Sequence, residues 1–481
     1  MGRRTKIVAT IGPASEDPDV LRAMLAAGMD AARLSLAHGT LDEALVRMRR
    51  IRAVAEAEDR LLAVLADLPG PKVRAGAFPE GGVPLAGGSL VEIVSGGAGE
   101  ASGEQRIAVD HPHAVRVLRE GDRVVLGDGA IELLVKAVAG DRATAEVVTG
   151  GWAQGRPGVG LPSGRLEIPS PTPEDLRLLA ALAEAQVDAA AISFVRSAAD
   201  IDKARASAGV DGPMLVAKVE TQEAVDALED IIAVADGVMI ARGDLGIRCA
   251  LEDVPHYQKR IIRTGVAFGR PVITATQMLE SMVRAPGPTR AEVSDVANAV
   301  FDGTSALMLS GETAVGHDPV AVVATMARIA TRAERDFDFE RWGRNLGRQQ
   351  TAGAVGAPAP ERITAAISAA GWRASIDAEV SAIIACTESG ATARAISRFR
   401  PTVPVLAATP SLRTARQLSM AWGITPILTD RHGTTDDIVW FAVKAAAERA
   451  FIHPGDLVAV LVGSPTDPEP ATDTLRIVRV Q

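Results

Sequence analysis

Residues 214–246, MLVAKVETQEAVDALEDIIAVADGVMIARGDLG, contain the unit from which the fold of this chain can be predicted. Two short apolar runs, MLVAKVETQ and GVMIARGDLG, enclose the amphipathic stretch TQEAVDALEDIIAVA. A helical pattern between two such runs predicts parallel strands joined by a crossover helix. Lys218 and Glu220 are two residues apart in the first run, so a strand would point both side chains the same way. Two ionisable groups therefore lie together on a segment that is otherwise suited to burial.

The same unit recurs along the chain. Eight short apolar runs are followed by helical patterns, and they read KIVATIG, AARLSLAHG, LLAVLADLPG, AAAISFVRS, MLVAKVETQ, GVMIARGDLG, PVITATQML and SALMLSGET. Eight strand–helix units favour an α/β protein with a closed TIM (β/α)₈ barrel over an open sheet. In such a barrel, polar residues at the carboxyl ends of the strands are the catalytic candidates.

Two segments fall outside this pattern. Residues 75–156 are Gly-rich with short alternating runs, which predicts an inserted small β-barrel lid domain over the active site. Residues 346–360 turn to Gly, Ala and Pro, which favours a linker. The runs VSAIIACTESG, VPVLAATPS and DLVAVLVGSP then predict a C-terminal α/β domain over residues 361–481. The barrel is accordingly assigned to residues 1–74 and 157–345.

Composition narrows the class of protein. The 481 residues are 47% hydrophobic and 23% charged, which is typical of a soluble globular protein. A net charge of -9 argues against nucleic-acid or membrane-surface binding, and two cysteines fit a reducing cytoplasm. No apolar h-region follows MGRRTKIVATIG, and no apolar stretch is long enough to span a bilayer. We therefore expect a cytoplasmic protein without a nucleic-acid or membrane partner.

Polar residues gather at the predicted strand ends. They are Arg33, Asp67, Ser193, Lys218, Glu220, Arg242, Gly243, Asp244, Thr274, Thr276, Ser310 and Glu312. Glu220 and Asp244 follow neighbouring strands, and two carboxylates suit Mg²⁺, which keeps exchangeable ligands. The alternative is a structural ion pair of each acid with Lys218 or Arg242. Lys218 itself either stabilises a developing negative charge or reaches from the barrel mouth into solvent.

Further anion-binding groups surround this set. Arg33 and Arg74 are candidate phosphate clamps because a guanidinium fork matches phosphate oxygens, although ordinary surface arginines remain the alternative. The Gly-rich turn in ARGDLG offers backbone N–H groups to a carboxylate or phosphate.

These residues lie in motifs that resemble the pyruvate kinase family. The segments are TKIVATIGPAS, GMDAARLSLAHG, GPKVRAG, ISFVRS, AKVET, ARGDLG, ITATQMLESM, PTRAEVSDVANAVFDG and MLSGETAVGHDP, in order from residue 5 onward. The resemblance implies a barrel A domain, a lid B domain, a C-terminal α/β domain and a homotetramer. It also implies transfer of the phosphoryl group of phosphoenolpyruvate to ADP, giving ATP and pyruvate in the final step of glycolysis, with Mg²⁺ or Mn²⁺.

The resemblance assigns roles to individual residues. Glu220 and Asp244 resemble the metal ligands. Lys218 resembles the residue that neutralises the transferring phosphoryl group and the enolate, and Arg33 resembles the arginine that contacts the phosphate. The amides of Gly243 and Asp244, with Thr276, resemble the holder of the substrate carboxylate.

Other residues complete the implied site. Ser193 belongs with the substrate-binding group, and Ser310 and Glu312 resemble a polar network that relays a proton to the enolate. The nucleotide-side candidates are His38, Arg74, Asp128 and Arg156. For His38, an ordinary structural role stays open.

The monovalent-cation segments depart from the family pattern. Most members bind K⁺ through R-x-N-x-S-H-G and D-T-K-G-P-E, whereas this chain reads RLSLAHG and DLPGPK. Ser35 and Ala37 replace Asn and Ser, Asp67 is kept, Leu68 replaces Thr and Lys72 replaces Glu. Our hypothesis is that Lys72 supplies the positive charge of K⁺, so that K⁺ is not required. The alternative is a surface lysine beside a degraded, poorly active site.

The lid segment departs as well. Where K-K-G-V-N-L-P is usual, this chain reads RPGVGLP, so Arg156 keeps one charge while Pro157 and Gly160 lose an ammonium and an amide. Weaker contacts to the nucleotide phosphates are the expected result. The segment RGDLGIRCALEDV has Arg-Cys-Ala at 248–250 where Glu-Ile-Pro is common. This change affects either a subunit contact or the surroundings of the metal.

The C-terminal domain carries a candidate effector loop. CTESGATARAIS places Thr387, Ser389, Gly390 and Thr392 at a strand-to-helix junction, where N–H groups and hydroxyls bind anions. The family uses this loop for sugar-phosphate effectors, but Glu388 would repel a phosphate. An ordinary helix cap is the alternative.

Two other functions stay open. One is a weakly active pyruvate-kinase-like paralogue kept as a regulatory subunit, which only the cation-site and lid departures favour. The other is a metal-dependent lyase or aldolase acting on pyruvate enolates, which explains neither the inserted nor the C-terminal domain. A coupled assay with phosphoenolpyruvate, ADP and Mg²⁺ separates them.

Overall fold

Eight parallel strands close into a barrel at the centre of the molecule. A computed structural model of the chain describes residues 2–37, 39–71, 73–96, 99–127, 131–161, 169–353, 359–465 and 471–481. The barrel strands are β1 (Lys6–Thr10), β2 (Ala31–Ser35), β3 (Ala63–Asp67), β12 (Ala189–Ile192), β13 (Met214–Val219), β14 (Gly237–Ala241), β15 (Val272–Ala275) and β16 (Ala306–Leu309). Their order around the barrel is β1-β16-β15-β14-β13-β12-β3-β2. The predicted (β/α)₈ barrel is confirmed.

Strand alternation produces two cores. In β1, Val8 faces the cluster inside the barrel, while Ile7 and Ala9 face the cluster between strands and helices. All three are fully buried, as expected for a parallel sheet covered on both faces. The inner cluster contains many alanines, among them Ala31 and Ala63, because little space remains inside eight strands.

Helices surround the barrel. They are α1 (Pro18–Ala27), α2 (Leu41–Ala57), α3 (Pro173–Glu184), α4 (Ala198–Ala208), α5 (Gln222–Asp226), α6 (Leu228–Val234), α7 (Arg242–Arg248), α8 (Val254–Ala267), α9 (Arg290–Phe301), α10 (Gly311–Ala314) and α11 (Pro319–Glu334), with 3₁₀ turns η2 (Leu251–Asp253) and η3 (Glu280–Val283). Capping boxes at Thr40, Thr172 and Thr289 satisfy the first amides of α2, α3 and α9. These helices therefore begin where side-chain oxygens replace missing carbonyls.

An inserted domain leaves the barrel after β3. Its strands are β4 (Val83–Leu85), β5 (Leu90–Gly96), β6 (Arg106–Asp110), β7 (Arg123–Leu126), β8 (Ile131–Ala139), β9 (Arg142–Thr149), β10 (Gly151–Ala153) and β11 (Val159–Gly160). They form a six-stranded sheet, β11-β7-β8-β9-β5-β6, and a two-stranded sheet, β10-β4. Because β11 pairs with β7, the inserted sheet continues past the boundary predicted at residue 156.

The C-terminal domain is a second α/β unit. It contains α12 (Phe339–Gly353), α13 (Ala359–Asp377), β17 (Ala382–Cys386), α14 (Ala391–Ser397), β18 (Val405–Thr409), α15 (Leu412–Leu418), β19 (Ile424–Leu428), α16 (Thr435–Glu448), β20 (Leu457–Val462) and β21 (Thr474–Arg479). The sheet order is β19-β18-β17-β20-β21, and β21 runs antiparallel to β20. The segment predicted as a linker holds the end of α12 and the start of α13, and its role as a domain boundary stays a prediction.

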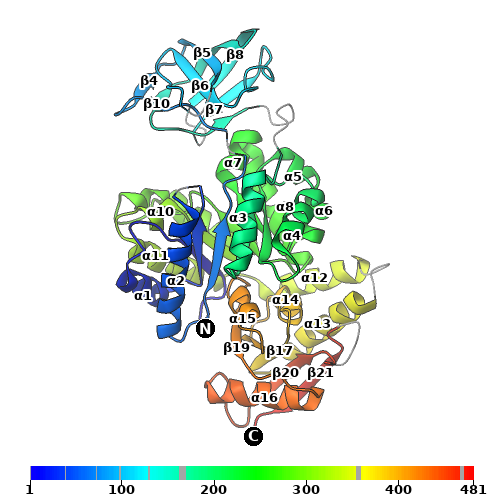
Figure 1. The fold of residues 1–481 in the computed structure, drawn as a ribbon. Helices are drawn as coiled ribbons and strands as arrows, with labels where there is room; N and C mark the ends of the chain where they lie inside the picture. The colour runs from blue at the N-terminus through cyan, green and yellow to red at the C-terminus, as the bar shows by residue number, and fades with distance from the viewer. Residues whose placement is uncertain are drawn as a thin grey trace.

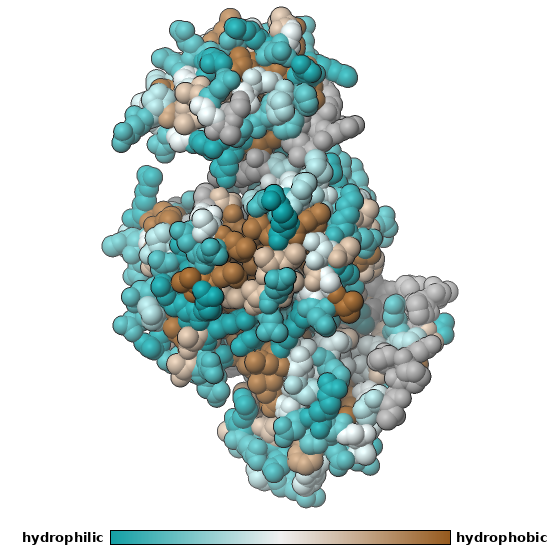
Figure 2. All heavy atoms as spheres, in the orientation of Figure 1, coloured by the Kyte–Doolittle hydropathy of each residue, from teal (hydrophilic) through white to brown (hydrophobic). Residues whose placement is uncertain are grey.

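The three parts lie in a row. The inserted domain stands above the barrel, with α7 directly beneath it, and the C-terminal domain packs at the opposite end (Figure 1). Figure 2 shows the surface notched between the inserted domain and the barrel. Among the described residues, the helices lack the combined length and apolarity needed to cross a membrane.

Candidate active site

Four charged residues meet at the barrel mouth. Three lie on the barrel strands β2, β3 and β13, and the fourth, Glu220, directly follows β13. Arg33 on β2 donates from Nε to Oδ2 of Asp67 at 2.8 Å, and its Nη2 lies 2.7 Å from the same oxygen. Lys218 on β13 places Nζ 3.2 Å from Oδ1 of Asp67 and 2.8 Å from Oε1 of Glu220. The expectation that Lys218 and Glu220 point the same way is confirmed. Asp67, a predicted strand-end residue and family cation position, lies between the two cations.

Burial and charge set the protonation of this cluster. Burial acts to raise the pKa of Asp67, but Lys218 and Arg33 outweigh it and hold that pKa below its usual value. Burial acts to lower the pKa of the Lys218 ammonium, but Asp67 and Glu220 outweigh it and raise that pKa. The pKa of Glu220 is raised, chiefly by burial, with a further contribution from the negative charge of Asp244. Lys218 is thus a permanent cation at the site.

The turn at Ser193 and Phe194, which follows β12, hydrogen-bonds to both Lys218 and Glu220. Lys218 Nζ donates to Ser193 Oγ at 2.8 Å, and Ser193 donates onward to the Leu68 carbonyl at 2.7 Å. The amide of Phe194 donates to Oε2 of Glu220 at 2.7 Å, with Phe194 in the left-handed region at φ 54°. Such strain in a bulky residue is typical of functional sites. At Gly70, also at positive φ, an added Cβ would lie 2.5 Å from Ser193 Cβ, so glycine permits this approach.

Glu220 and Asp244 fit a divalent cation. Glu220 is fully buried, and its Oε1 receives no hydrogen bond of good geometry although Lys218 lies nearby. Burial and the negative charge of Asp244 both disfavour the charged form of Glu220. A cation between the two acids would offset the burial and the repulsion between the carboxylates. Within the described ranges no three acidic, His or Cys side chains cluster as metal ligands. Two carboxylates plus substrate oxygens and waters is nevertheless a usual Mg²⁺ arrangement.

Gly243 and Thr276 face each other across β14 and β15. The Gly243 amide donates to Thr276 Oγ1 at 2.9 Å, and that hydroxyl donates to the Ala275 carbonyl at 2.7 Å. Arg242 fixes this loop through the Ala275 and Thr276 carbonyls and an ion pair with Asp295 at 2.7 Å. Arg242 therefore pairs with an acid on α9, which the sequence did not indicate.

Ser310 and Glu312 lie together after β16. Glu312 is fully buried, and its carboxylate accepts the amides of Ser310 at 2.6 Å and Leu279 at 3.1 Å. These bonds tie the loop after β15 to the loop after β16. Glu312 is thus a positioning residue in this structure, and the proton relay stays a prediction.

The two arginines predicted for the nucleotide side, Arg74 and Arg156, lie together at the hinge of the inserted domain. The backbone of Arg74 forms an isolated antiparallel β-bridge with Gly158. The Arg74 side chain donates from Nη1 to the Arg156 carbonyl at 3.3 Å. Arg156 forms an ion pair with Asp110 of β6 at 2.6 Å. The structure thus groups Arg74 with Arg156.

Three candidates lie outside the described residues. These are His38, Lys72 and Asp128. Of the other cation-site positions, Ser35 ends β2 partly buried, and Leu68 is a buried apolar residue after β3.

The candidate effector loop borders a cavity of about 420 Å³ in the C-terminal domain. Thr387, Ser389 and Thr392 line the cavity. Gly390 does not line it, and its amide donates to Thr387 Oγ1. Glu388, which also lines it, lies 3.5 Å from Arg431. The effector role stays a prediction.

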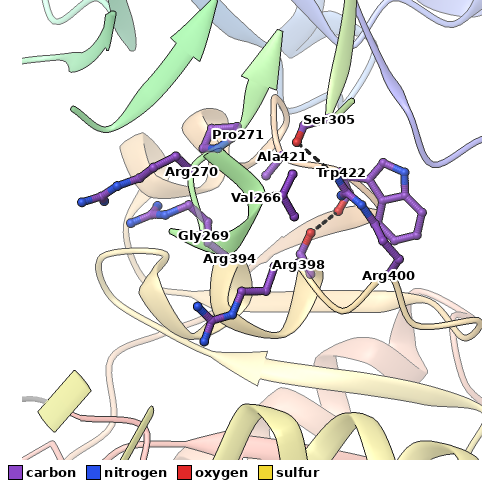
Figure 3. Close-up of a pocket in the computed structure, with 11 residues that line it drawn as sticks. Val266, Gly269, Arg270, Pro271, Ser305, Arg394, Arg398, Arg400, Ala421 and Trp422 are labelled. Atoms are coloured by element: carbon purple, nitrogen blue, oxygen red, sulfur yellow. Dashed lines mark hydrogen bonds between the residues drawn. The ribbon is translucent and has the colours of Figure 1, made fainter. Parts of the chain in front are cut away.

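A second, smaller cavity lies where the barrel meets the C-terminal domain. It encloses about 20 Å³, and its arginine side chains spread in different directions instead of converging (Figure 3). Arg398 donates to the Ala267 carbonyl, and Arg400 donates to the Gly303 carbonyl and stacks on Trp422. These guanidinium groups join the two domains.

One further site residue escaped the sequence reasoning. Thr10, at the end of β1, accepts Nη1 of Arg33 at 2.9 Å and donates to the Leu309 carbonyl. The only available signal was a polar residue ending an apolar strand, the same signal that identified Arg33.

Comparison with protein families gives two matches. A model described as "Pyruvate kinase, barrel domain" matches residues 2–323, and one described as "Pyruvate kinase, alpha/beta domain" matches residues 365–478.

Curated relatives match along the whole chain. A pyruvate kinase of Clostridium acetobutylicum is 36% identical, with 100% of both chains covered. A pyruvate kinase of Agrobacterium vitis is 39% identical, covering 99% of this chain and 97% of its own. One from Methylorubrum extorquens is 38% identical, covering 99% and 98%.

Proposed function

This chain belongs to the pyruvate kinase family, and on that premise we propose that it transfers the phosphoryl group of phosphoenolpyruvate to ADP, giving pyruvate and ATP. The observation that carries the proposal is the chain of ion pairs Arg33–Asp67–Lys218–Glu220 at the barrel mouth. Phosphoryl transfer depends chiefly on positioning and charge neutralisation, and this cluster offers both.

Arg33 and Lys218 are proposed to bind the phosphoryl group. Asp67 and Thr10 hold the Arg33 guanidinium, so its orientation is set before substrate arrives. Ser193 and Asp67 hold the Lys218 ammonium in the same manner. Preorganised positive charge of this kind stabilises the transition state without reorganisation during the reaction.

Glu220 and Asp244 are proposed to hold Mg²⁺ or Mn²⁺. Such an ion, when bound, supplies positive charge to substrate phosphate and enolate oxygens. The amides of Gly243 and Asp244, with Thr276, are proposed to hold the substrate carboxylate, Ser193 to assist, and Ser310 with Glu312 to serve the protonation of the enolate. Arg74 and Arg156 are proposed for the nucleotide side, with His38 and Asp128.

Independence from K⁺ is a further part of the proposal. Both oxygens of Asp67 already face cations, Oδ1 toward Lys218 and Oδ2 toward Arg33. Leu68 offers no side-chain ligand, and its carbonyl accepts the Ser193 hydroxyl. We propose that Lys72 supplies the remaining charge.

A coupled assay tests the function. Purified protein, phosphoenolpyruvate, ADP and Mg²⁺ are combined with lactate dehydrogenase, and NADH oxidation reports pyruvate. Pyruvate formation that depends on both substrates supports the proposal. Absence of pyruvate with and without K⁺ contradicts it and favours the paralogue or the lyase.

Assembly and location complete the proposal. A homotetramer in the cytoplasm is proposed from the family, and light scattering on the purified chain tests the assembly. A particle of about 50 kDa, the mass of one chain, would contradict a tetramer.

A further inference from the structure

Arg248 lies at the seam between the barrel and the inserted domain. It ends α7, the helix that begins directly after β14 and carries Gly243 and Asp244. An added Cβ at Gly160 of β11 would lie 2.4 Å from Ile247 Cγ2, so the inserted sheet touches α7 one residue before Arg248. Figure 1 shows α7 directly below the inserted domain. Arg248 is therefore close to both surfaces that border the site.

A ring contact fixes Arg248 relative to the metal candidates. Its Cζ lies 4.8 Å from the centre of the Phe194 ring. The Phe194 amide donates to Glu220, and the ring is buried. Only one residue thus separates the guanidinium from a proposed metal ligand. Stacking uses the face of a guanidinium and leaves the N–H groups at its edge free to bind an anion.

Among the described residues no acid forms an ion pair with Arg248, although Glu223, Asp226 and Asp253 act electrostatically on the adjacent Cys249. Other arginines near the site have such partners: Arg33 has Asp67 and Arg242 has Asp295. Among the residues that the structure describes, the partly exposed Arg248 side chain forms no ion pair and no hydrogen bond. A fixed guanidinium with unused donors fits a phosphate, which it binds through two parallel bonds.

We propose that Arg248 binds the phosphates of the nucleoside diphosphate and supplies positive charge that the inserted domain lacks at Pro157. This inference rests on the proposed function and extends it to one specificity-determining residue. The phosphate chain, not the base, is the recognised group, since a guanidinium pairs with phosphate oxygens. Arg248 would contribute little to phosphoenolpyruvate binding, which Arg33 and Lys218 provide.

The test compares Arg248→Met with Arg263→Met. Arg263 is exposed on α8 and undergoes the same chemical change away from the site. R248M should raise the KM for ADP roughly tenfold and leave kcat and the KM for phosphoenolpyruvate within about twofold. R263M should match the wild type. Arg248→Lys keeps the charge and should fall between the wild type and R248M.

Calorimetric titration with MgADP, without phosphoenolpyruvate, gives a readout independent of turnover. R248M should bind MgADP about tenfold more weakly than the wild type. Equal binding, or an equal rise in both KM values, would overturn the role of Arg248. A wild-type chain that makes no pyruvate would contradict the proposed function. The titration would still test whether Arg248 binds the phosphates of MgADP, because it does not depend on turnover.

Discussion

The ammonium nitrogen of Lys218 lies 2.8 Å from Oε1 of Glu220, at the end of one barrel strand. The Lys218 side chain is 12% exposed and that of Glu220 is fully buried, so the pair is largely shielded from water. Asp67 adds a second carboxylate 3.2 Å from the same ammonium. Lys218 therefore lies between two buried acids, of which Asp67 also pairs with Arg33, so this ammonium serves both the stability and the chemistry of the barrel mouth.

Replacing Lys218 by Met should affect both properties. Turnover should fall roughly 10²–10³-fold because a preorganised charge is lost. Stability should fall by about 3–5 kcal/mol because buried Glu220 loses its ion-pair partner and Asp67 keeps only Arg33. Coupled assays and denaturant unfolding measure the two effects.

Ser193→Ala is the matched control for Lys218. It removes one hydrogen bond to the ammonium and keeps its charge, so stability should fall by only about 1 kcal/mol. A K218M protein with more than one tenth of the wild-type turnover would show that this charge is dispensable.

Asp67 should make stability sensitive to acid. Its pKa is lowered in the folded protein by Lys218 and Arg33, against the effect of burial. A lowered pKa contributes stability that is present above the ordinary aspartate value of about 3.9 and is lost as pH falls through the folded-state value. The melting temperatures of the wild type and Asp67→Asn should therefore differ most near neutral pH and converge below about pH 4.

Asp230→Asn, on the exposed side of α6, is the control for this measurement. Its melting temperature should follow that of the wild type at every pH. A gap between wild type and D67N that widens on acidification would contradict the assigned sign.

Glu220→Gln tests the metal. The substitution keeps the shape of the side chain and removes its charge, so the Mg²⁺ concentration for half-maximal activity should rise at least about tenfold. Chelation with EDTA should abolish turnover, and added Mg²⁺ should restore it. Mn²⁺ binding, followed by paramagnetic resonance, should weaken in parallel. An unchanged Mg²⁺ requirement in E220Q would remove Glu220 from the ligand set.

The monovalent-cation proposal is tested at Lys72. In tetramethylammonium buffer without K⁺ the wild type should be fully active, since Asp67 already faces two cations. Lys72→Glu should lose turnover in that buffer and recover part of it on addition of K⁺. Strong activation of the wild type by K⁺ would refute the substitution of lysine for the cation.

The barrel and much of its mouth were predictable because they depend on local periodicity. Strand ends of a closed barrel converge, so Arg33, Lys218 and Glu220 could be grouped from their positions alone. The pairing of Asp67 with two cations was not predictable, because it depends on side-chain reach between β2, β3 and β13. Thr10 also ends an apolar strand, but its hydrogen bond to Arg33 depends on the same side-chain reach between strands.

Composition did not reveal the helices that extend into residues 346–360, and the domain boundary there stays a prediction. Gly and Pro suggested a linker, yet residues 346–353 continue α12. The segment begins Leu-Gly-Arg-Gln-Gln, in which Leu, Arg and Gln are good helix formers that offset one Gly. The contact between Gly160 and Ile247 was also beyond reach, since it joins segments from different domains.

That contact decides how the weakened nucleotide site should be tested. Asn at position 160 would need Ile247 to move, because an added Cβ lies 2.4 Å from its Cγ2. Pro157→Lys avoids this conflict. Proline has no N–H to lose, and the Pro157 carbonyl, which accepts the Ala75 amide at 2.8 Å, is kept. The new ammonium should lower the KM for ADP several-fold by pairing with a phosphate.

Pro157→Ala separates charge from backbone effects. It removes the ring without adding an ammonium, so its KM for ADP should stay near that of the wild type. Gly160→Asn should instead raise this KM, because the seam between β11 and α7 must open to admit the side chain. If P157K and P157A bind ADP equally well, the hinge of the inserted domain does not approach the nucleotide phosphates, and the low charge of RPGVGLP has no bearing on nucleotide affinity.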